Sequence, residues 1–392
     1  MTTEEYIQLH RGESITKLAL SISRIAGVDG SRALRQIEGW QRLRMKVPTW
    51  ASCEGIEYPP RLSLEQCSGE SAARYKADIV RRVCPIRNTM ADLTGGLGVD
   101  FSFLAPLFRC SSFVERKESL VALARHNLPI LGVRNADFIE MDAESYLQRM
   151  CPVDLLYLDP ARRDGSGNKI FRITDCEPNV AALLSLLRQK STIILLKLSP
   201  MLDLKEACSM LESPMEAHVF ADGGECKELV FVLGKRSPVY PTTIYCADGI
   251  HRFMFTFDAE ASATSDYTAD IKAGNFLYEP SPALLKAGAY RLLATQFRLA
   301  KLHPNSHLYI SGTRVANFPG RQFVVLRSTG FKKQELRTFI NNRKRANLTI
   351  RNFPMGVSEL RHRLRMEEGG DEYWFATTLA DGQHRIIACR KI

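Results

Sequence analysis

Short apolar runs alternate with helical stretches through the middle of the chain. Five of these runs have the length and character of buried strands, and a stretch with helical spacing separates each from the next. Such alternation predicts βαβ units, in which helices cover both faces of a parallel sheet. The predicted strands are Met90–Leu93, Ser112–Val114, Phe138–Met141, Leu155–Leu158 and Thr192–Leu198.

Two further apolar runs follow the fifth strand and lie close together. His218–Ala221 and Leu229–Leu233 are separated by a segment that contains the turn Asp222-Gly223-Gly224. Because this gap is too short for a crossover helix, we expect the two runs to form an antiparallel hairpin. The middle of the chain is therefore predicted to be a sheet of five parallel strands that ends in an antiparallel pair.

The regions on either side show different patterns. Residues 14–45 have helical spacing with a break at 27–30, and Ser63–Val83 predicts one more helix. Helices are also predicted at Pro282–Phe297 and Phe331–Ala346. We expect a helical N-terminal region (1–85), an α/β domain (86–235) and an α+β domain (236–392). The strands predicted in the last domain are Thr243–Cys246, Arg252–Phe257, Leu308–Ile310, Gln322–Leu326, Leu348–Arg351, Tyr373–Thr378 and Arg385–Cys389.

The positive charge is confined to the C-terminal part of the chain. The formal net charge is +10, yet residues 1–235 carry 30 basic and 30 acidic side chains. Residues 236–392 carry 23 basic and 13 acidic side chains and so hold the whole excess. A confined excess of this kind indicates a domain that meets a polyanion.

Several classes of protein are excluded by the remaining composition. The N-terminus shows no signal peptide, and no apolar run approaches the roughly 18 residues that span a bilayer. The 10 cysteines are scattered without a C-x-x-C pair, which argues against a zinc ribbon and a disulfide framework. We expect a reduced cytoplasmic protein with no membrane partner and no bound metal; the sequence leaves the oligomeric state open.

A glycine-rich loop follows the first predicted strand. In Ala91-Asp92-Leu93-Thr94-Gly95-Gly96-Leu97-Gly98-Val99-Asp100 the backbone must turn sharply and come close to a ligand, which favours glycine. The nicotinamide-dinucleotide motif needs a third glycine or alanine where this chain has Phe101, so that interpretation fails. The loop resembles the first motif of class I methyltransferases, which use S-adenosylmethionine (SAM) and share the predicted strand arrangement.

That resemblance implies a set of SAM-binding residues. Asp92 and the loop would hold the methionine part, Glu115 at the end of the second strand would accept both ribose hydroxyls, and Asp142 after the third would meet the adenine. Taken singly, each acid could equally be a solvated turn residue. Gln66 and Ser68 precede the first strand and would close over the cofactor, although Ser68 could instead cap a helix. The full set is Asp92, Thr94, Gly96, Gly98, Asp100, Glu115, Asp142, Gln66 and Ser68.

The fourth strand ends in a second motif. Asp159-Pro160-Ala161-Arg162 lies at the carboxyl edge of the sheet, where ligands bind in such folds, and resembles the fourth methyltransferase motif. Enzymes of the family that methylate base amines have a second proline and an aromatic residue where this chain has Ala161 and Arg162. This departure argues against a base amine as target, although the plane of Arg162 could stack on a base or pair with an acid.

Four charged residues match another pattern in order and placement. Lys76, Asp159, Lys197 and Glu228 resemble the Lys-Asp-Lys-Glu tetrad of 2′-O-ribose methyltransferases. A ribose hydroxyl must lose its proton as it attacks, and a lysine beside a second lysine in a dry cleft is expected to have a lowered pKa and act as base. Chance could also produce such an order, but a lysine inside an apolar strand, as at Lys197, needs a reason.

Basic residues cluster after Phe331. Lys332, Lys333, Arg337, Arg343, Lys344, Arg345 and Arg351 are the candidate nucleic-acid ligands. Phe331, Phe339 and Phe353 lie among them, either to stack on bases or to fill the core.

Together with SLEQCSGESAARYKA, YLDPARRD, KLSPM and RNFPMGVSELRHRLRMEEGGDEYWFATT, these motifs resemble a bacterial family of SAM-dependent methyltransferases with a THUMP-like C-terminal domain. The resemblance implies methyl transfer to RNA, such as tRNA or rRNA. The alternatives are an RNA-binding protein with an inactive SAM fold, and a methyltransferase for protein or small molecules.

Overall fold

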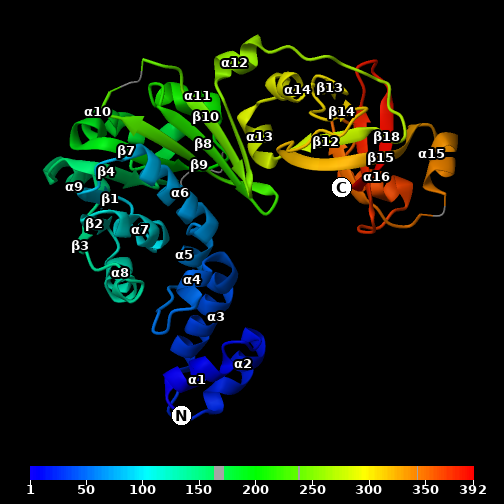
Figure 1. The fold of residues 1–392 in the computed structure, drawn as a ribbon. Coiled ribbons are helices and arrows are strands. Elements are labelled where there is room, and N and C mark those ends of the chain that lie inside the picture. The colour runs from blue at the N-terminus through cyan, green and yellow to red at the C-terminus, as the bar shows by residue number, and fades with distance from the viewer. Residues whose placement is uncertain (163–171, 237–238, 342) are drawn as a thin grey trace. The chain divides into compact units, whose positions relative to one another are not determined.

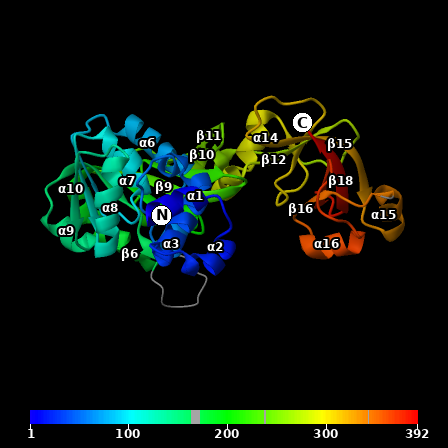
Figure 2. The ribbon, with the colours of Figure 1, turned by 90° about the horizontal axis from the view of Figure 1, so that it is seen from below.

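The chain forms two compact units (Figures 1 and 2). The computed structural model describes residues 1–162, 172–236, 239–341 and 343–392, apart from the side chains of Arg24, Leu62 and Arg162. The first unit comprises residues 1–217 and 227–240, and the second comprises residues 218–226 and 241–392. Within these residues, no helix has the length and apolar character needed to cross a membrane.

The sheet of the first unit has the predicted class I methyltransferase topology. Its strand order is β9-β7-β4-β1-β2-β3, and all neighbours are parallel except β7 and β9. The turn Gly223-Gly224 joins β8 to β9, and the Met215 N–H donates to the Val232 carbonyl, as in the predicted hairpin. The strands are β1 (Thr89–Asp92), β2 (Cys110–Glu115), β3 (Ala136–Glu140), β4 (Val153–Leu158), β7 (Ser191–Leu198) and β9 (Glu225–Gly234). Most of β8 (Glu216–Asp222) and the turn after it are counted with the second unit.

Helices cover both faces of this sheet (Figure 1). On one face, apolar residues of α6, α7 and α8 pack on Phe113, Tyr157 and Leu195. On the other face, α10 packs on β4 and β7 and α9 on β2. The helices are α6 (Glu70–Val83), α7 (Val99–Leu104), α8 (Glu118–Ile130), α9 (Ala143–Arg149), α10 (Val180–Lys190) and α11 (Leu204–Met210). After β4 come the short strands β5 (Ala161–Arg162) and β6 (Cys176–Glu177), which pair antiparallel.

The N-terminal region is helical, as predicted. It contains α1 (Thr3–His10), α2 (Ile15–Ser21), α3 (Gly30–Lys46), α4 (Pro48–Ala51) and α5 (Arg61–Gln66). The single helix predicted at Ser63–Val83 is wrong, because the chain is extended at Cys67 and Gly69 between α5 and α6.

The second unit contains a mixed sheet of order β13-β14-β12-β15-β18-β17-β16. On one face of this sheet, Phe323, Phe375 and Ile387 form part of a hydrophobic core. On the other face, α15 and α16 pack against Trp374 and Ile386. Outside this sheet, the strands β10 (Thr243–Asp248) and β11 (His251–Phe255) of the second unit pair antiparallel with each other. The strands of the sheet are β12 (Phe276–Pro280), β13 (Ala300–Lys301), β14 (Tyr309–Ser311), β15 (Gly320–Gly330), β16 (Asn347–Arg351), β17 (Glu372–Thr378) and β18 (His384–Lys391). The helices of the unit are α12 (Phe257–Ser262), α13 (Pro282–Ala287), α14 (Arg291–Phe297), α15 (Lys333–Ile340) and α16 (Val357–Leu364).

Two helices predicted in this unit are shorter than expected. The helix predicted at Pro282–Phe297 is split into α13 and α14, because Gly288 takes a φ of 83°. The helix predicted at Phe331–Ala346 ends at Ile340, where Asn341 takes a φ of 38°. Left-handed conformations at glycine and asparagine are a common way for helices to end.

Candidate active site

Four sequence-predicted residues meet at the carboxyl edge of the first sheet. The Nζ of Lys76 lies 2.5 Å from Oε1 of Glu228, and the Nζ of Lys197 lies 2.5 Å from Oδ2 of Asp159. Lys76 comes from α6, whereas the other three come from strands β4, β7 and β9 or the residue that follows. The side chain of Lys76 is fully buried, while 35% of the Asp159 side chain is exposed. Asp159 is therefore the member of the cluster that a substrate can reach.

Asp100 links the cluster to the glycine loop. Its Oδ2 accepts hydrogen bonds from the Ser68 hydroxyl (2.7 Å) and the Tyr157 hydroxyl (2.6 Å). Its Oδ1 lies 3.1 Å from the Nζ of Lys76 but receives no hydrogen bond of good geometry from the described residues. Lys76 also donates to Ser68 at 3.4 Å. The role of helix cap proposed for Ser68 is wrong, because Gly69 is the N-cap residue of α6.

Lys197 does not have the lowered pKa that the sequence led us to expect. Burial lowers the pKa of Lys197, but the carboxylates of Asp159, Asp100 and Glu228 outweigh burial and raise it. Lys197 is therefore a cation here. The charges of Lys76 and Lys197 likewise hold the pKa of Asp100 below its usual value against the effect of burial.

The glycine loop is shaped by its neighbours in the fold. A Cβ on Gly95 would lie 2.4 Å from Cζ of Phe113, and Gly96 and Gly98 take φ values of 56° and 85°. Asp92 accepts from the N–H of Thr94 at 2.9 Å, and the Thr94 hydroxyl accepts from the N–H of Asp159 at 2.6 Å. The loop is thus tied to the end of β4, which brings the first and fourth motifs together.

Asp92 lies buried at the end of β1 with its carboxylate in this loop. Burial, together with the negative charges of Asp100 and Asp159, raises the pKa of Asp92 well above its usual value. Counted over the described residues named above, the cluster has four carboxylates and two lysines. An arrangement with this surplus of acid favours a ligand that brings positive charge.

Glu115 and Asp142 lie at the ends of β2 and β3 as predicted, but each already holds backbone groups. Glu115 accepts from the N–H groups of Gly96 (3.0 Å) and Lys117 (2.9 Å). Asp142 caps α9 by accepting from the N–H of Ser145 at 2.8 Å, and this hydrogen bond lowers its pKa. Gln66 is the exposed last residue of α5.

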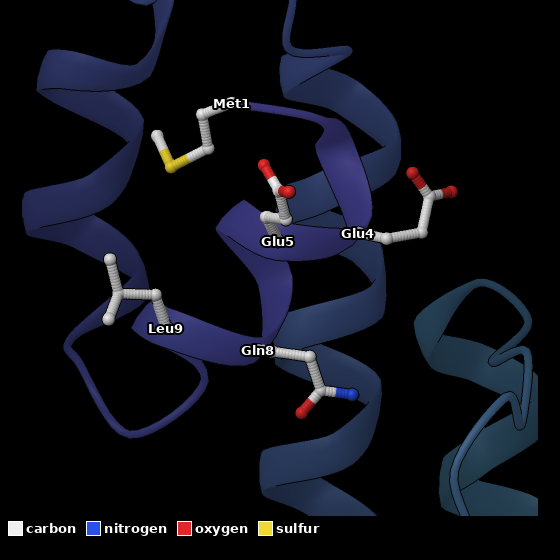
Figure 3. A pocket seen from close by; sticks show the side chains of 5 residues that line it. All are labelled: Met1, Glu4, Glu5, Gln8 and Leu9. Atoms are coloured by element: carbon white, nitrogen blue, oxygen red, sulfur yellow. The ribbon is translucent and has the colours of Figure 1, made fainter.

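The second motif continues into a short strand. Pro160 is buried, and Ala161–Arg162 pairs with Cys176–Glu177. The side chain of Arg162 and residues 163–171 lie outside the described part of the chain. A shallow hollow of about 820 Å³ on α1 is lined by Met1, Glu4, Glu5, Gln8 and Leu9 (Figure 3), so none of the clustered residues lines it.

A solved structure resembles the whole chain, and two family models match its C-terminal part. Residues 276–319 match the model of a ferredoxin-like domain, and residues 320–391 match a THUMP domain-like model. The crystal structure of the "putative methyltransferase from Porphyromonas gingivalis W83" is 35% identical, with a TM-score of 0.87, over 99% of this chain and 97% of that chain. The chain belongs to this family of class I SAM-dependent methyltransferases with a THUMP-like C-terminal domain.

Other similarities of this methyltransferase are more remote. The structure of a "putative RNA methyltransferase" from Pyrococcus horikoshii is 14% identical with a TM-score of 0.36, over 51% of this chain and 98% of that chain, too low to indicate function. No curated protein matches this methyltransferase.

Sequence reasoning missed Tyr157 and the place of Asp100 in the lysine cluster of this methyltransferase. Tyr157 lies in the apolar run that predicted β4, so its hydroxyl attracted no notice, although a buried tyrosine hydroxyl needs a partner. Asp100 was counted with the cofactor loop, because its approach to Lys76 depends on how α6 packs on α7.

The three phenylalanines among the basic residues belong to the core. Phe339 is buried against Trp374, with ring centroids 4.9 Å apart, while Phe331 and Phe353 pack edge to face. Of the candidate nucleic-acid ligands, Arg343 and Arg351 are engaged with Glu372 and Glu279 at 3.0 and 2.7 Å. Arg345 pairs with Glu367 on the surface, whereas Lys332, Lys333, Arg337 and Lys344 have no ion-pair partner within the described residues.

Proposed function

We propose that the carboxyl edge of the first sheet binds SAM and that the protein transfers the methyl group to RNA in the cytoplasm. The single observation that carries the cofactor assignment is the surplus of acidic side chains over lysines beside a glycine loop that leaves no room for a side chain at Gly95. SAM brings a sulfonium and an ammonium, and it supplies an electrophilic methyl group. The raised pKa of Asp92 fits such a cation.

We assign the cofactor contacts by position. Asp92 and the backbone of Thr94, Gly96 and Gly98 would hold the methionine part of SAM. Glu115 keeps further lone pairs for the ribose hydroxyls, since each oxygen accepts a single backbone hydrogen bond. Asp142 would meet the adenine with its second oxygen. Gln66 and Ser68 would border the methionine end.

The finer proposal is a ribose 2′-hydroxyl as the target. Asp159 is the accessible carboxylate and would accept the hydroxyl proton as the oxygen takes the methyl group, whose bond to sulfur would break so that S-adenosylhomocysteine leaves. Lys197 would hold Asp159 in position, and Lys76 with Glu228 would fix the network behind it. The short strand at Ala161–Arg162 supports this choice over a base amine, because no aromatic ring follows Pro160 there.

RNA is the proposed substrate because of the charge of the C-terminal part. Residues 236–392 hold 23 basic and 13 acidic side chains, and four of the candidate cations are free to meet phosphates. The match of residues 320–391 to a THUMP domain-like model supports the same choice.

Methyl-labelled SAM tests the proposal when it is incubated with the protein and with RNA, DNA and protein fractions. We expect label in RNA, and we expect Asp159→Ala to abolish it while SAM binding persists. Label in protein or in a small molecule would contradict the substrate class. Measurable SAM binding without transfer to any fraction would favour an inactive SAM fold that binds RNA.

A further inference from the structure

The free cations of the second unit form one surface over two helices. Lys332, Lys333 and Arg337 are exposed on α15 and the residue before it, and Arg363 is exposed on α16. The guanidinium of Arg363 lies 4.5 Å from the ring centroid of Phe331, next to Lys332, so the two groups of cations meet there. We call Lys332, Lys333, Arg337, Lys344, Arg363 and Arg365 the α15–α16 surface.

None of these side chains has a carboxylate partner within the described residues, whereas several arginines of the sheet do. Arg327 and Arg343 hold Glu372, and Arg321 and Arg351 hold Glu279. Arginines held in this way fix the sheet and have fewer donors left for a ligand. The cations of the α15–α16 surface keep all their donors for an outside anion.

Among the described residues of this surface, the phenylalanines offer no open ring face on which a base could stack, and an exposed ring on α16 is the small imidazole of His362. Arg363 covers one face of Phe331, and Phe353 meets that ring edge to face at 5.0 Å. Phe339 is buried, with Arg327 over its ring at 4.8 Å. Recognition of single-stranded RNA relies on such stacking, whereas helical RNA presents stacked bases inside and phosphates outside.

We propose that the α15–α16 surface binds the phosphate backbone of double-helical RNA, so that the substrate is recognised through a stem and not through an unpaired segment. The proposal rests on RNA being the substrate. Arg363 suits this task, because a guanidinium stacked on a ring keeps its N–H edge available for a phosphate.

Binding of fluorescent RNA to the full-length protein tests the proposal. The probes are an RNA hairpin with a long stem and an unstructured single strand of equal length, titrated at several salt concentrations. We expect at least about tenfold tighter binding of the hairpin. The variant Lys332→Gln/Lys333→Gln/Arg337→Gln should lower the slope of log K against log salt by about 2 to 3, as expected for three lost phosphate contacts.

The matched control is Arg298→Gln/Arg314→Gln/Lys391→Gln, which removes the same charge from exposed positions elsewhere in the unit. It should change the slope much less. Equal effects of the two variants, equal binding of the single strand, or equal binding of duplex DNA would overturn the proposal. Methyl transfer measured with the same RNAs distinguishes failure of this inference from failure of the proposed function. Transfer of the methyl group without preference for the hairpin would refute only the inference. Preference for the hairpin without transfer would refute the proposed activity.

Discussion

Buried charge is the main feature of the active site at the residue scale. Lys76 is fully buried between Glu228 and Asp100. Three carboxylates raise the pKa of Lys197. Buried charges cost solvation free energy, and the network persists because each group has a close partner. This arrangement explains why single substitutions here should affect stability as well as activity.

Lys76→Met should destabilise the protein by about 3 to 5 kcal/mol, because it leaves Glu228 and Asp100 buried without their cation. Urea unfolding measures the change. Arg81→Met on the same helix removes an exposed pair with Asp78 and should cost less than about 1 kcal/mol. Equal costs for the two variants would show that the buried pair has no special weight.

Asp92→Asn should stabilise the free protein at neutral pH and weaken SAM binding at least about tenfold. The folded state holds the proton of Asp92 to a higher pH than the unfolded chain, because the pKa is raised. The folded state therefore binds more protons in that window, and stability falls as pH rises from the unfolded pKa to the folded one. Asparagine does not titrate, so Asp92→Asn removes this loss of stability. The gain in free energy of unfolding should therefore grow as pH rises across the same window, as measured by unfolding titrations. A gain independent of pH would contradict this role of Asp92.

At the scale of elements, the loop after β1 depends on its contact with β2. Gly95→Ala should displace this loop and weaken SAM binding, because the new Cβ would lie 2.4 Å from the Phe113 ring. Calorimetric titration of SAM measures the loss. Adding Phe113→Leu should restore part of the affinity, and Gly12→Ala, where nothing lies within 4 Å, is the control. Lack of any rescue would mean that the contact is not the cause.

In the second unit, Glu372 at the start of β17 links its own strand to β15 and to the segment after α15. Burial alone would raise the pKa of Glu372, but hydrogen bonds from Arg327 and Trp374 and the partner Arg343 lower it to about 2. Its stabilising effect is present above the unfolded pKa and is lost as pH falls through the folded one.

Glu372→Gln should therefore cost about 2 kcal/mol at neutral pH, and the difference from the wild type should vanish between about pH 5 and pH 2. Chemical unfolding at several pH values measures it. The exposed Glu367→Gln removes a surface pair with Arg345 and should show little change. A difference that persists at low pH would refute the assigned role of the carboxylate.

Elements with a clear periodicity could be predicted from the sequence, and their ends could not. The apolar runs at Leu155–Leu158 and Thr192–Leu198 predicted β4 and β7, which begin two residues and one residue earlier. The helix predicted at Phe331–Ala346 was too long, because Asn341 adopts a left-handed conformation that the helical spacing does not reveal. Helix ends depend on single backbone conformations, which hydrophobic patterns record poorly.

For the whole molecule, the division of charge in the sequence separates a neutral α/β part from a basic C-terminal part. The strand-end acids and lysines could be named in advance because the carboxyl ends of parallel strands share one edge. Tyr157 and the second role of Asp100 could not, because they depend on the packing of α6 and α7. The split between paired and free arginines also depends on tertiary contacts.

The most direct test of the account is the chemical position of the transferred methyl group. RNA labelled by the protein with methyl-labelled SAM is digested to nucleosides, which are then separated. We predict label on the ribose as a 2′-O-methyl nucleoside, and none after reaction with Lys197→Met. Label on a base would contradict the ribose assignment to Asp159 and Lys197, and absence of label from RNA would contradict the proposed substrate itself.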